Sequence, residues 1–145
     1  MTTDYELRQA IIDKINDSVA DGTLSYVGEA YWMPDKITKM PAVVVMPEPS
    51  ESEYQNTAGG RHRVFIYRAY VLKAIENESQ TDTEKLITHA RDELIELFDK
   101  KNALELEGLL SISPVPTIPD IIDYGGGEAR VFTLILRCNV IVSTT

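Results

Sequence analysis

The side chains that could act as nucleophiles, general bases or metal ligands are few in this sequence and lie far apart. One cysteine, Cys138, and two histidines, His62 and His89, are present. A catalytic cysteine needs a neighbouring cation that lowers the pKa of its thiol, whereas Cys138 lies inside an alternating apolar run, which predicts a packing role. His89 has Asp92 and Glu93 on the same predicted helical face. No second histidine accompanies it, so we interpret this group as a solvated helix face instead of a metal site.

The glycine-rich and serine-containing segments also lack the neighbours that would make them catalytic. Gly59–Gly60 is followed by Arg61 without the Lys-Ser/Thr pair of a phosphate-binding loop, and residues 125–127 follow a proline-rich segment instead of a strand. Ser50 and Ser52 lack the Gly-x-Ser-x-Gly pattern of a nucleophilic serine. We therefore predict no catalytic, cofactor-binding or metal-binding residues, and a protein that is not an enzyme.

The charge balance of the chain argues against specific DNA binding. The 23 Asp and Glu residues outnumber the 14 Lys and Arg residues, which gives a formal net charge of −9 and a pI of about 4.7. A molecule with this charge repels phosphate backbones. The length of 145 residues suits one domain, residues 1–145, built around a single core.

The cysteine content and the hydropathy pattern predict a reducing, intracellular setting without a membrane partner. A single cysteine cannot form an internal disulfide. The first residues, Met1–Asp4, do not begin a basic stretch followed by an apolar one. No uninterrupted apolar segment approaches the roughly 18 residues that a membrane-spanning helix needs.

Two segments have the apolar spacing of an amphipathic helix. The first helix is predicted over residues 5–19 and the second over residues 83–100. Thr3 with Glu6, and Thr81 with Glu84, have the spacing of a capping box, in which the hydroxyl accepts from a free backbone N–H of the first turn. The predicted buried stripes are Leu7, Ile11, Ile15 and Val19 in the first helix, and Leu86, Ala90, Leu94, Leu97 and Phe98 in the second.

Four segments have the composition or alternation of β-strands. They are residues 42–46, 63–75, 104–112 and 129–143, and a short strand or turn is predicted near Tyr26. The element order is therefore α-β-β-α-β-β. We predict an α+β fold in which both helices pack on one face of a mostly antiparallel sheet, with strands 42–46 and 63–75 paired as an extended hairpin.

The two longest predicted strands determine which side chains form the core. In the last strand, the register that contains Phe132, Leu134 and Cys138 is assigned to the core. In strand 63–75, the register that contains Phe65, Tyr67 and Val71 is assigned to the opposite face. That face is too apolar to stay uncovered in water, which is a first indication of assembly.

The segment from Glu48 to Gly60 is polar and acidic and reads as a long mobile hairpin loop. Connections of this length within a domain serve binding or remain disordered, and the sequence leaves both interpretations open. His62 with its flanking arginines is either a site for an acidic partner or an ordinary strand end. Candidate subunit or partner contacts are Glu48, Glu51, Glu53, Tyr54, Arg61, Arg63, Phe65, Tyr67 and Tyr124.

The last third of the chain contains Pro114, Pro116, Pro119 and the glycine run 125–127. Proline fixes the backbone in an extended form and glycine allows sharp turns. We therefore predict a stiff connection over residues 114–119 and a flexible joint or turn at the glycines. A hinged surface segment is one hypothesis for this region.

The layout resembles the tail terminator (tail completion) proteins of long-tailed bacteriophages, which belong to a wider family of neck and tail-tube proteins. The resemblance rests on the order of elements along nearly the whole chain and on no single sequence motif. The features that carry it are the helix Tyr5–Val19, the strand starting Pro41-Ala42-Val43-Val44-Val45 with its long polar loop, the strand Arg63–Ile75, the helix Thr83–Lys100 and the strand Arg130–Val142.

The resemblance implies a structural virion protein with no cofactor. Such a protein forms a homo-oligomeric ring, typically of six copies, which caps the tail tube, ends its polymerisation and joins tail to head. Its partners would be the tail-tube protein and head-connector proteins, and DNA would pass through without specific binding. The resemblance implies assembly in the host cytoplasm and a final place in the tail of the virion.

Two alternatives remain open from the sequence. One is a tail-tube or head-tail connector subunit, which would share the fold and the acidic character. The other belongs to a different class, a small cytoplasmic ligand-binding domain or enzyme with a pocket between sheet and helices lined by Tyr67, Tyr70 or Tyr124.

Overall fold

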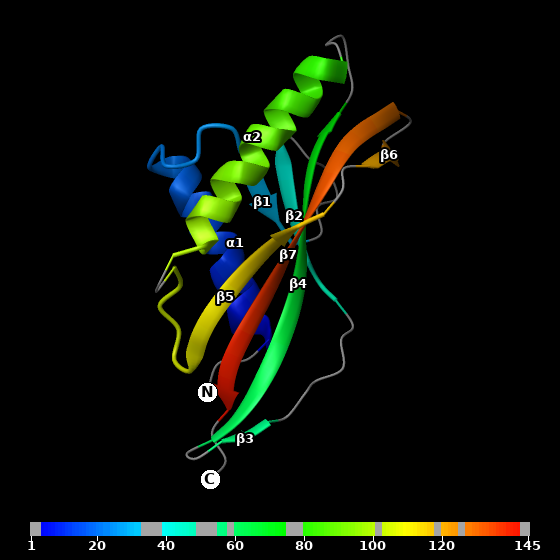
Figure 1. Cartoon of the computed structure of the whole chain (residues 1–145). Helices are drawn as coiled ribbons and strands as arrows, with labels where there is room; N and C mark the ends of the chain where they lie inside the picture. Colours follow the sequence, from blue (N-terminus) through cyan, green and yellow to red (C-terminus); the bar gives the residue numbers. More distant parts are fainter. Residues whose placement is uncertain are drawn as a thin grey trace.

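The computed structural model describes residues 4–32, 39–48, 55–57, 60–74, 80–100, 103–117, 120–124 and 127–142. Within these ranges the chain forms one seven-stranded sheet with two helices on one of its faces (Figure 1). The elements are α1 (Asp4–Ala20), β1 (Glu29–Tyr31), β2 (Ala42–Pro47), β3 (Gln55–Thr57), β4 (Gly60–Ala74), α2 (Gln80–Phe98), β5 (Leu109–Pro116), β6 (Asp120–Tyr124) and β7 (Gly127–Val142). The predicted α+β class, with a mostly antiparallel sheet, is confirmed.

Both helices are held by one apolar stripe each, close to the predicted positions. In α1, Leu7, Ile11 and Ile15 are fully buried, and Val19 packs at the margin of the core. In α2 the buried stripe includes Ile87, while Leu86 is only half-buried. The helix α2 begins at Gln80, so Thr81 lies in its first turn and not at the predicted cap; Thr3 lies outside the described residues.

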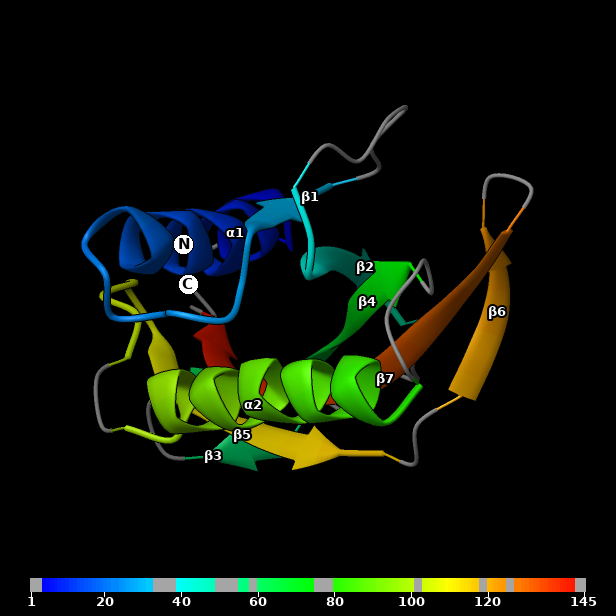
Figure 2. The same ribbon diagram turned by 90° about the horizontal axis from the view of Figure 1, so that it is seen from above.

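The sheet is organised around two long neighbouring strands, β4 and β7. They pair antiparallel from Arg61 opposite Val142 to Ala74 opposite Ala129. The path across the sheet is β1-β2-β4-β7-β5, with β3 on β4 and β6 on β7. The β1–β2 pair is parallel and the remaining described pairs are antiparallel. Figure 2 shows α1 beside β1 and β2, and α2 along β5 and β7.

The predicted hairpin between β2 and β4 is confirmed, with Ala42 opposite Leu72 and Pro47 opposite Tyr67. The segment predicted as a loop contains a further short strand, β3, which pairs with the start of β4. Alternation of apolar residues could not predict β3, because its sequence, Gln-Asn-Thr, is polar throughout. Residues 49–54 and 58–59 lie outside the described residues.

The predicted face assignment is correct for β7 and wrong for β4. Phe132, Leu134 and Cys138 are buried under the helices, as expected. Tyr67 and Val71 of β4 are also fully buried there, because Tyr67 lies opposite Leu136 and Val71 opposite Phe132. Directly opposite residues of paired strands share a face, so the register of β4 follows from its partner. The apolar residues of β4 lie on both faces, so they do not by themselves identify the register that faces the core.

Residues 109–116 and 120–124 form the strands β5 and β6, where a stiff connection was predicted over 114–119, and the predicted joint or turn falls between β6 and β7. Pro114 and Pro116 lie within β5, and the glycine run follows β6, which pairs back onto β7. Residues 103–108 do not continue β5 towards the N-terminus, although Leu104 and Leu106 pack against the core. The alternating leucines therefore belong to a loop, in which Leu104 and Leu106 contact the core. Pro119 and residues 125–126 lie outside the described residues.

The entry into β5 requires a glycine. Gly108 has a φ of 82°, and a Cβ atom there would lie 2.6 Å from the carbonyl oxygen of Ile141. The backbone N–H of Ile141 donates to the Gly108 carbonyl at 2.7 Å. Any larger residue would separate these two segments. The register irregularity of β5 lies between Leu109 and Ser111, next to Gly108.

Tyr67→Phe should lower the free energy of unfolding by about 1 to 3 kcal/mol. The hydroxyl of Tyr67 donates to the carboxylate of Asp4 and so links β4 to the start of α1, and burial together with this bond raises the pKa of the hydroxyl. Urea unfolding at neutral pH measures the loss. Tyr5→Phe is the matched control, because Tyr5 is 67% exposed, and equal losses in both variants would contradict this description of the core.

Candidate assembly surface

The residues with chemical potential do not form a site in the part of the chain that the structure describes. Cys138 is fully buried, and burial raises the pKa of its thiol to about 12. His89 is exposed and stacks on Tyr26, with ring centroids 4.7 Å apart. No group of three His, Cys, Asp or Glu side chains among the described residues is placed to hold a metal ion. Neither described helix has the length and apolar composition needed to cross a membrane.

Tyr67 and Tyr70, two of the tyrosines that were predicted to line a ligand pocket, lie on opposite faces of the sheet. Tyr67 is buried under the helices, whereas Tyr70 belongs to a small cluster on the other face of the sheet. Tyr124 ends β6, opposite Gly127. A hollow of about 270 Å³ lies elsewhere, where α2 ends and β5 begins. Its titratable lining side chains are Asp99 and Lys100, fewer than the convergent polar set of a ligand site.

The sheet face that turns away from the helices carries apolar side chains that neither helix covers. Because side chains alternate along each strand, it carries the register opposite to Tyr67 and Leu136. We call it the outer face, and its members over β4, β5 and β7 are Val64, Ile66, Arg68, Tyr70, Val115, Thr133, Ile135 and Arg137. Val115 is 44% exposed and the other apolar members are half-buried. Nothing among the described residues is layered over them.

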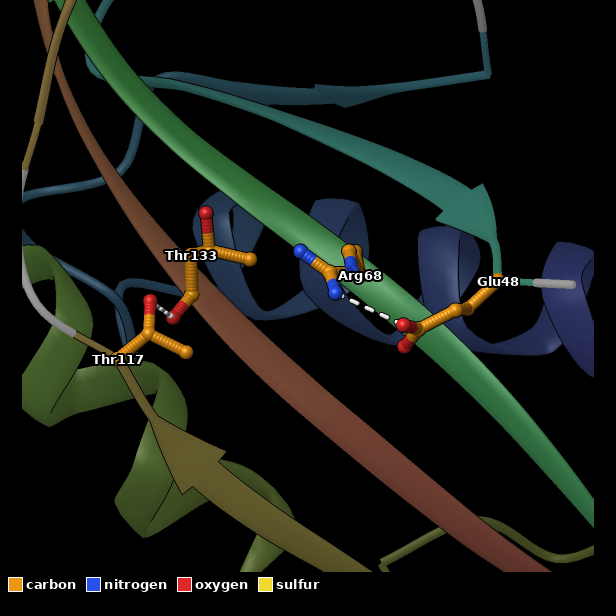
Figure 3. A network of polar contacts seen from close by, with 4 residues as sticks. All are labelled: Glu48, Arg68, Thr117 and Thr133. Carbon is orange, nitrogen blue, oxygen red and sulfur yellow. Dashed lines mark hydrogen bonds and ion pairs between the residues drawn. The ribbon is translucent and has the colours of Figure 1, made fainter. Parts of the chain in front are cut away.

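An ion pair anchors the margin of the outer face. The guanidinium of Arg68 donates to Glu48 at 2.7 Å (Figure 3). Glu48 is positioned by its own backbone N–H, which donates to the carbonyl of Ile66 at 2.9 Å. The hydrogen bond from Arg68 lowers the pKa of the Glu48 carboxyl and raises that of the guanidinium. The bond thus ties the residue after β2 to the middle of β4.

Figure 3 also shows a polar contact between Thr117 and Thr133, which lies at the end of β5. Both the backbone N–H and the hydroxyl of Thr117 donate to the carbonyl of Thr133, at 3.0 and 2.7 Å. Thr117 follows β5 directly, so it holds the end of that strand on β7. On the outer face itself, the side-chain amide of Asn139 donates to the hydroxyl of Ser111 at 2.9 Å.

Arg137 is the charged side chain of the outer face that pairs with no other residue in the described part of the chain. It is exposed and lies opposite Ile66 on β4 and Ser113 on β5. The two acidic side chains at the margin already have partners. Glu48 pairs with Arg68, and Glu29 accepts a hydrogen bond from the hydroxyl of Tyr31 at 2.8 Å. Arg137 is therefore an exposed cation among apolar neighbours.

The helical layer has the opposite charge. The segments α1 and α2 contain nine acidic and four basic residues, a formal charge of −5. Along the solvent side of α2, Asp92, Glu96 and Asp99 are all exposed, spaced by four and then three residues. The molecule is therefore two-sided, with an acidic helical layer and an apolar outer face that carries arginines.

Both ends of the five-strand path are closed to further strand pairing. At β1, the side chain of Asn16 takes the place of a neighbouring strand, because it accepts from the N–H of Ala30 at 2.8 Å and donates to its carbonyl at 3.1 Å. At β5, pairing with β7 continues through Pro114 and Pro116, so their nitrogen atoms, which carry no hydrogen, face outward. Missing donors and capped edges discourage edge-to-edge addition.

The residues predicted as contacts are dispersed. Glu48 lies at the margin of the outer face, whereas Tyr67 is in the core. Arg63 and Phe65 have the helix-side register near the end of the sheet, with the guanidinium 4.8 Å from the ring centroid. Arg61 lies on β4 opposite Val142 and Tyr124 lies on β6. Glu51, Glu53 and Tyr54 lie outside the described residues.

Sequence reasoning missed Arg68, Arg137, Ile66 and Ile135, the residues that characterise the outer face. A signal was available in the alternation of β4. Arg68 shares its register with Val64, Ile66 and Tyr70. A charged residue in the middle of one register indicates that this register faces solvent, whereas the other register is apolar from Phe65 to Val71 and faces the core.

Comparison with known proteins identifies the fold but no family. No protein-family model matches the chain, and no curated protein matches it. A chain from a solved structure described as the virion of a native gene transfer agent particle aligns over 94% of this chain and 95% of its own length, with 12% identity and a TM-score of 0.59. A second solved structure, designated only by a sequence code, aligns over 100% of both chains with 16% identity and a TM-score of 0.56. These likenesses show a shared fold.

Glu48→Gln should lower the free energy of unfolding at neutral pH by less than about 1 kcal/mol, because the ion pair is partly exposed. The folded-state pKa of Glu48 lies below its ordinary value of 4.5. The stabilisation is therefore present above that value and is lost as the pH falls through the lowered pKa. Urea unfolding of variant and wild type at neutral pH and at about pH 2 measures the difference in the free energy of unfolding under both conditions. A difference between variant and wild type that persists undiminished in acid would contradict this role of the pair.

Proposed function

We propose that the chain is a structural subunit of a phage-like particle and acts by assembling with copies of itself and with other particle proteins. The observation that carries the proposal is the likeness of fold, over nearly the full length of both chains, to a chain of a gene transfer agent virion. The uncovered outer face supports it, because soluble monomers rarely leave an extended apolar surface open. The described residues present no constellation that favours catalysis instead.

Within that class, we propose the role of a tail terminator, a ring that caps the tail tube and joins it to the head connector. The layout of helices and strands supports this role, as does the net charge of −9, because an acidic protein lets DNA pass without adhering. The closed strand edges also support a ring over a continuous intersubunit sheet. The partners of such a ring are the tail-tube protein and head-connector proteins, and its place is the virion tail.

The mass of the protein in solution tests self-assembly. Light scattering after size-exclusion chromatography, over a concentration series, should show a discrete species, and six copies of 16.3 kDa amount to about 98 kDa. Negative-stain images of that species should show closed rings. Open tubes of growing length would favour a tail-tube subunit instead of a terminator. A monomer at concentrations up to about 1 mM would contradict the proposal.

A further inference from the structure

The distribution of charge limits how two copies of this chain can associate. If two outer faces met, Arg137 of each copy would approach the arginines of the other. If two helical layers met, two surfaces with a formal charge of −5 each would be opposed. Like charges at an interface cost free energy and select against that pairing. The outer face against the helical layer is the arrangement that brings opposite charges together.

Strand addition is a poor alternative at the ends of the five-strand path, because Asn16 caps β1 and the two prolines of β5 remove outward donors. Association through the faces of the molecule is therefore favoured over strand addition at these two edges. A face-to-face contact between different surfaces is heterologous, so every added copy presents a new free surface until the assembly closes into a ring.

The solvent side of α2 offers the surface that matches the outer face. Tyr26, 39% exposed, stacks on His89 of α2 and provides an apolar patch. Tyr26 is held in place because the carboxylate of Glu93 accepts from the backbone N–H groups of Ser25 and Tyr26, at distances of 2.7 to 3.0 Å. Asp92, Glu96 and Asp99 continue from this patch along the helix. We call these residues, with Tyr26 and His89, the α2 ridge.

The spacing of charges agrees on the two surfaces. Arg68 and Arg137 lie on adjacent strands, offset by two residues, because Arg68 is opposite Ile135. At about 3.4 Å per residue and 4.8 Å between strands, their Cα atoms are about 8 Å apart. Glu96 and Asp99 lie about 4.5 Å apart along the helix axis, and Asp92, which pairs with Arg91 at 3.1 Å, extends the row of carboxylates to about 10 Å. Two guanidinium groups can therefore each meet a carboxylate of the ridge.

We infer that the outer face of one copy binds the α2 ridge of the next copy, with Arg137 and Arg68 pairing to Glu96 and Asp99 and with Ile66, Tyr70 and Ile135 packing against the stack of Tyr26 and His89. This inference rests on the proposed self-assembly and adds which two surfaces meet. It makes the second copy the layer that covers the outer face.

Charge-reversed variants test the contact. Arg137→Glu should weaken self-association at least about tenfold, and the double variant Glu96→Lys/Asp99→Lys should do the same, because each opposes like charges in the contact. The triple variant that combines all three changes restores opposite charges and should regain most of the association. Sedimentation velocity over a concentration series measures the association constants. Arg68 is left unchanged, because its removal would also free Glu48.

Lys14→Glu is the matched control, because it changes the net charge by the same amount as Arg137→Glu but makes the helical layer more acidic. It should associate at least as tightly as the wild type. Circular dichroism checks that each variant is folded, which is expected because Arg137, Glu96 and Asp99 are exposed.

The possible outcomes separate this inference from the proposed function. Wild-type association that neither reversal weakens would overturn the inference and leave self-assembly intact. If Arg137→Glu weakened association but Glu96→Lys/Asp99→Lys did not, the assignment of the α2 ridge would be overturned. That result would indicate another partner surface for the outer face. A wild-type protein that remains monomeric at about 1 mM would contradict self-assembly, and the inference with it.

Discussion

The pairing of β4 with β7 is the interaction on which the rest of the structure depends. It continues without a break from Arg61 opposite Val142 to Ala74 opposite Ala129, and each remaining strand of the sheet joins it directly or through β2. Because side chains alternate along a strand, two long paired strands necessarily present two large faces. The two helices cover one of them, where Tyr67, Leu134 and Leu136 are fully buried. The other face is left for a partner.

The proposed contact at the outer face accounts for two features that a monomer would not need. Arginines on an apolar sheet and carboxylates on the solvent side of a helix are each unremarkable alone. Together they give the molecule two different complementary surfaces, which a closed ring or an open filament requires. The capped edge at Asn16 and the outward prolines of β5 direct association away from strand pairing. The chain shares its fold with a chain of a gene transfer agent virion.

The sequence predicted the positions of helices and strands better than it predicted which face of each strand lies in the core. The spacing of Leu7, Ile11 and Ile15, and the alternation ending in Val140, follow from local burial and were sufficient for both helices and for β7. The register of β4 was not predictable in that way, since Phe65, Tyr67 and Val71 are as apolar as Val64, Ile66 and Tyr70. Arg68 in the middle of the strand and the pairing with β7 decide between them. The polar β3 and the proline-containing end of β5, residues 114–116, depend on neighbouring strands, so local patterns did not indicate their structure.

The central claim is that two different surfaces of neighbouring copies are in contact, and cross-linking through one cysteine on each surface tests it most directly. In a chain that carries both Ile135→Cys and His89→Cys, a short bifunctional maleimide should produce a ladder of linked copies, because the sheet separates the two positions within one copy. The native Cys138 is buried with a raised pKa and should not contribute. Each single-cysteine chain should give no linked dimer. Efficient dimers from Ile135→Cys alone would contradict the account, because they would show that outer faces pair with each other.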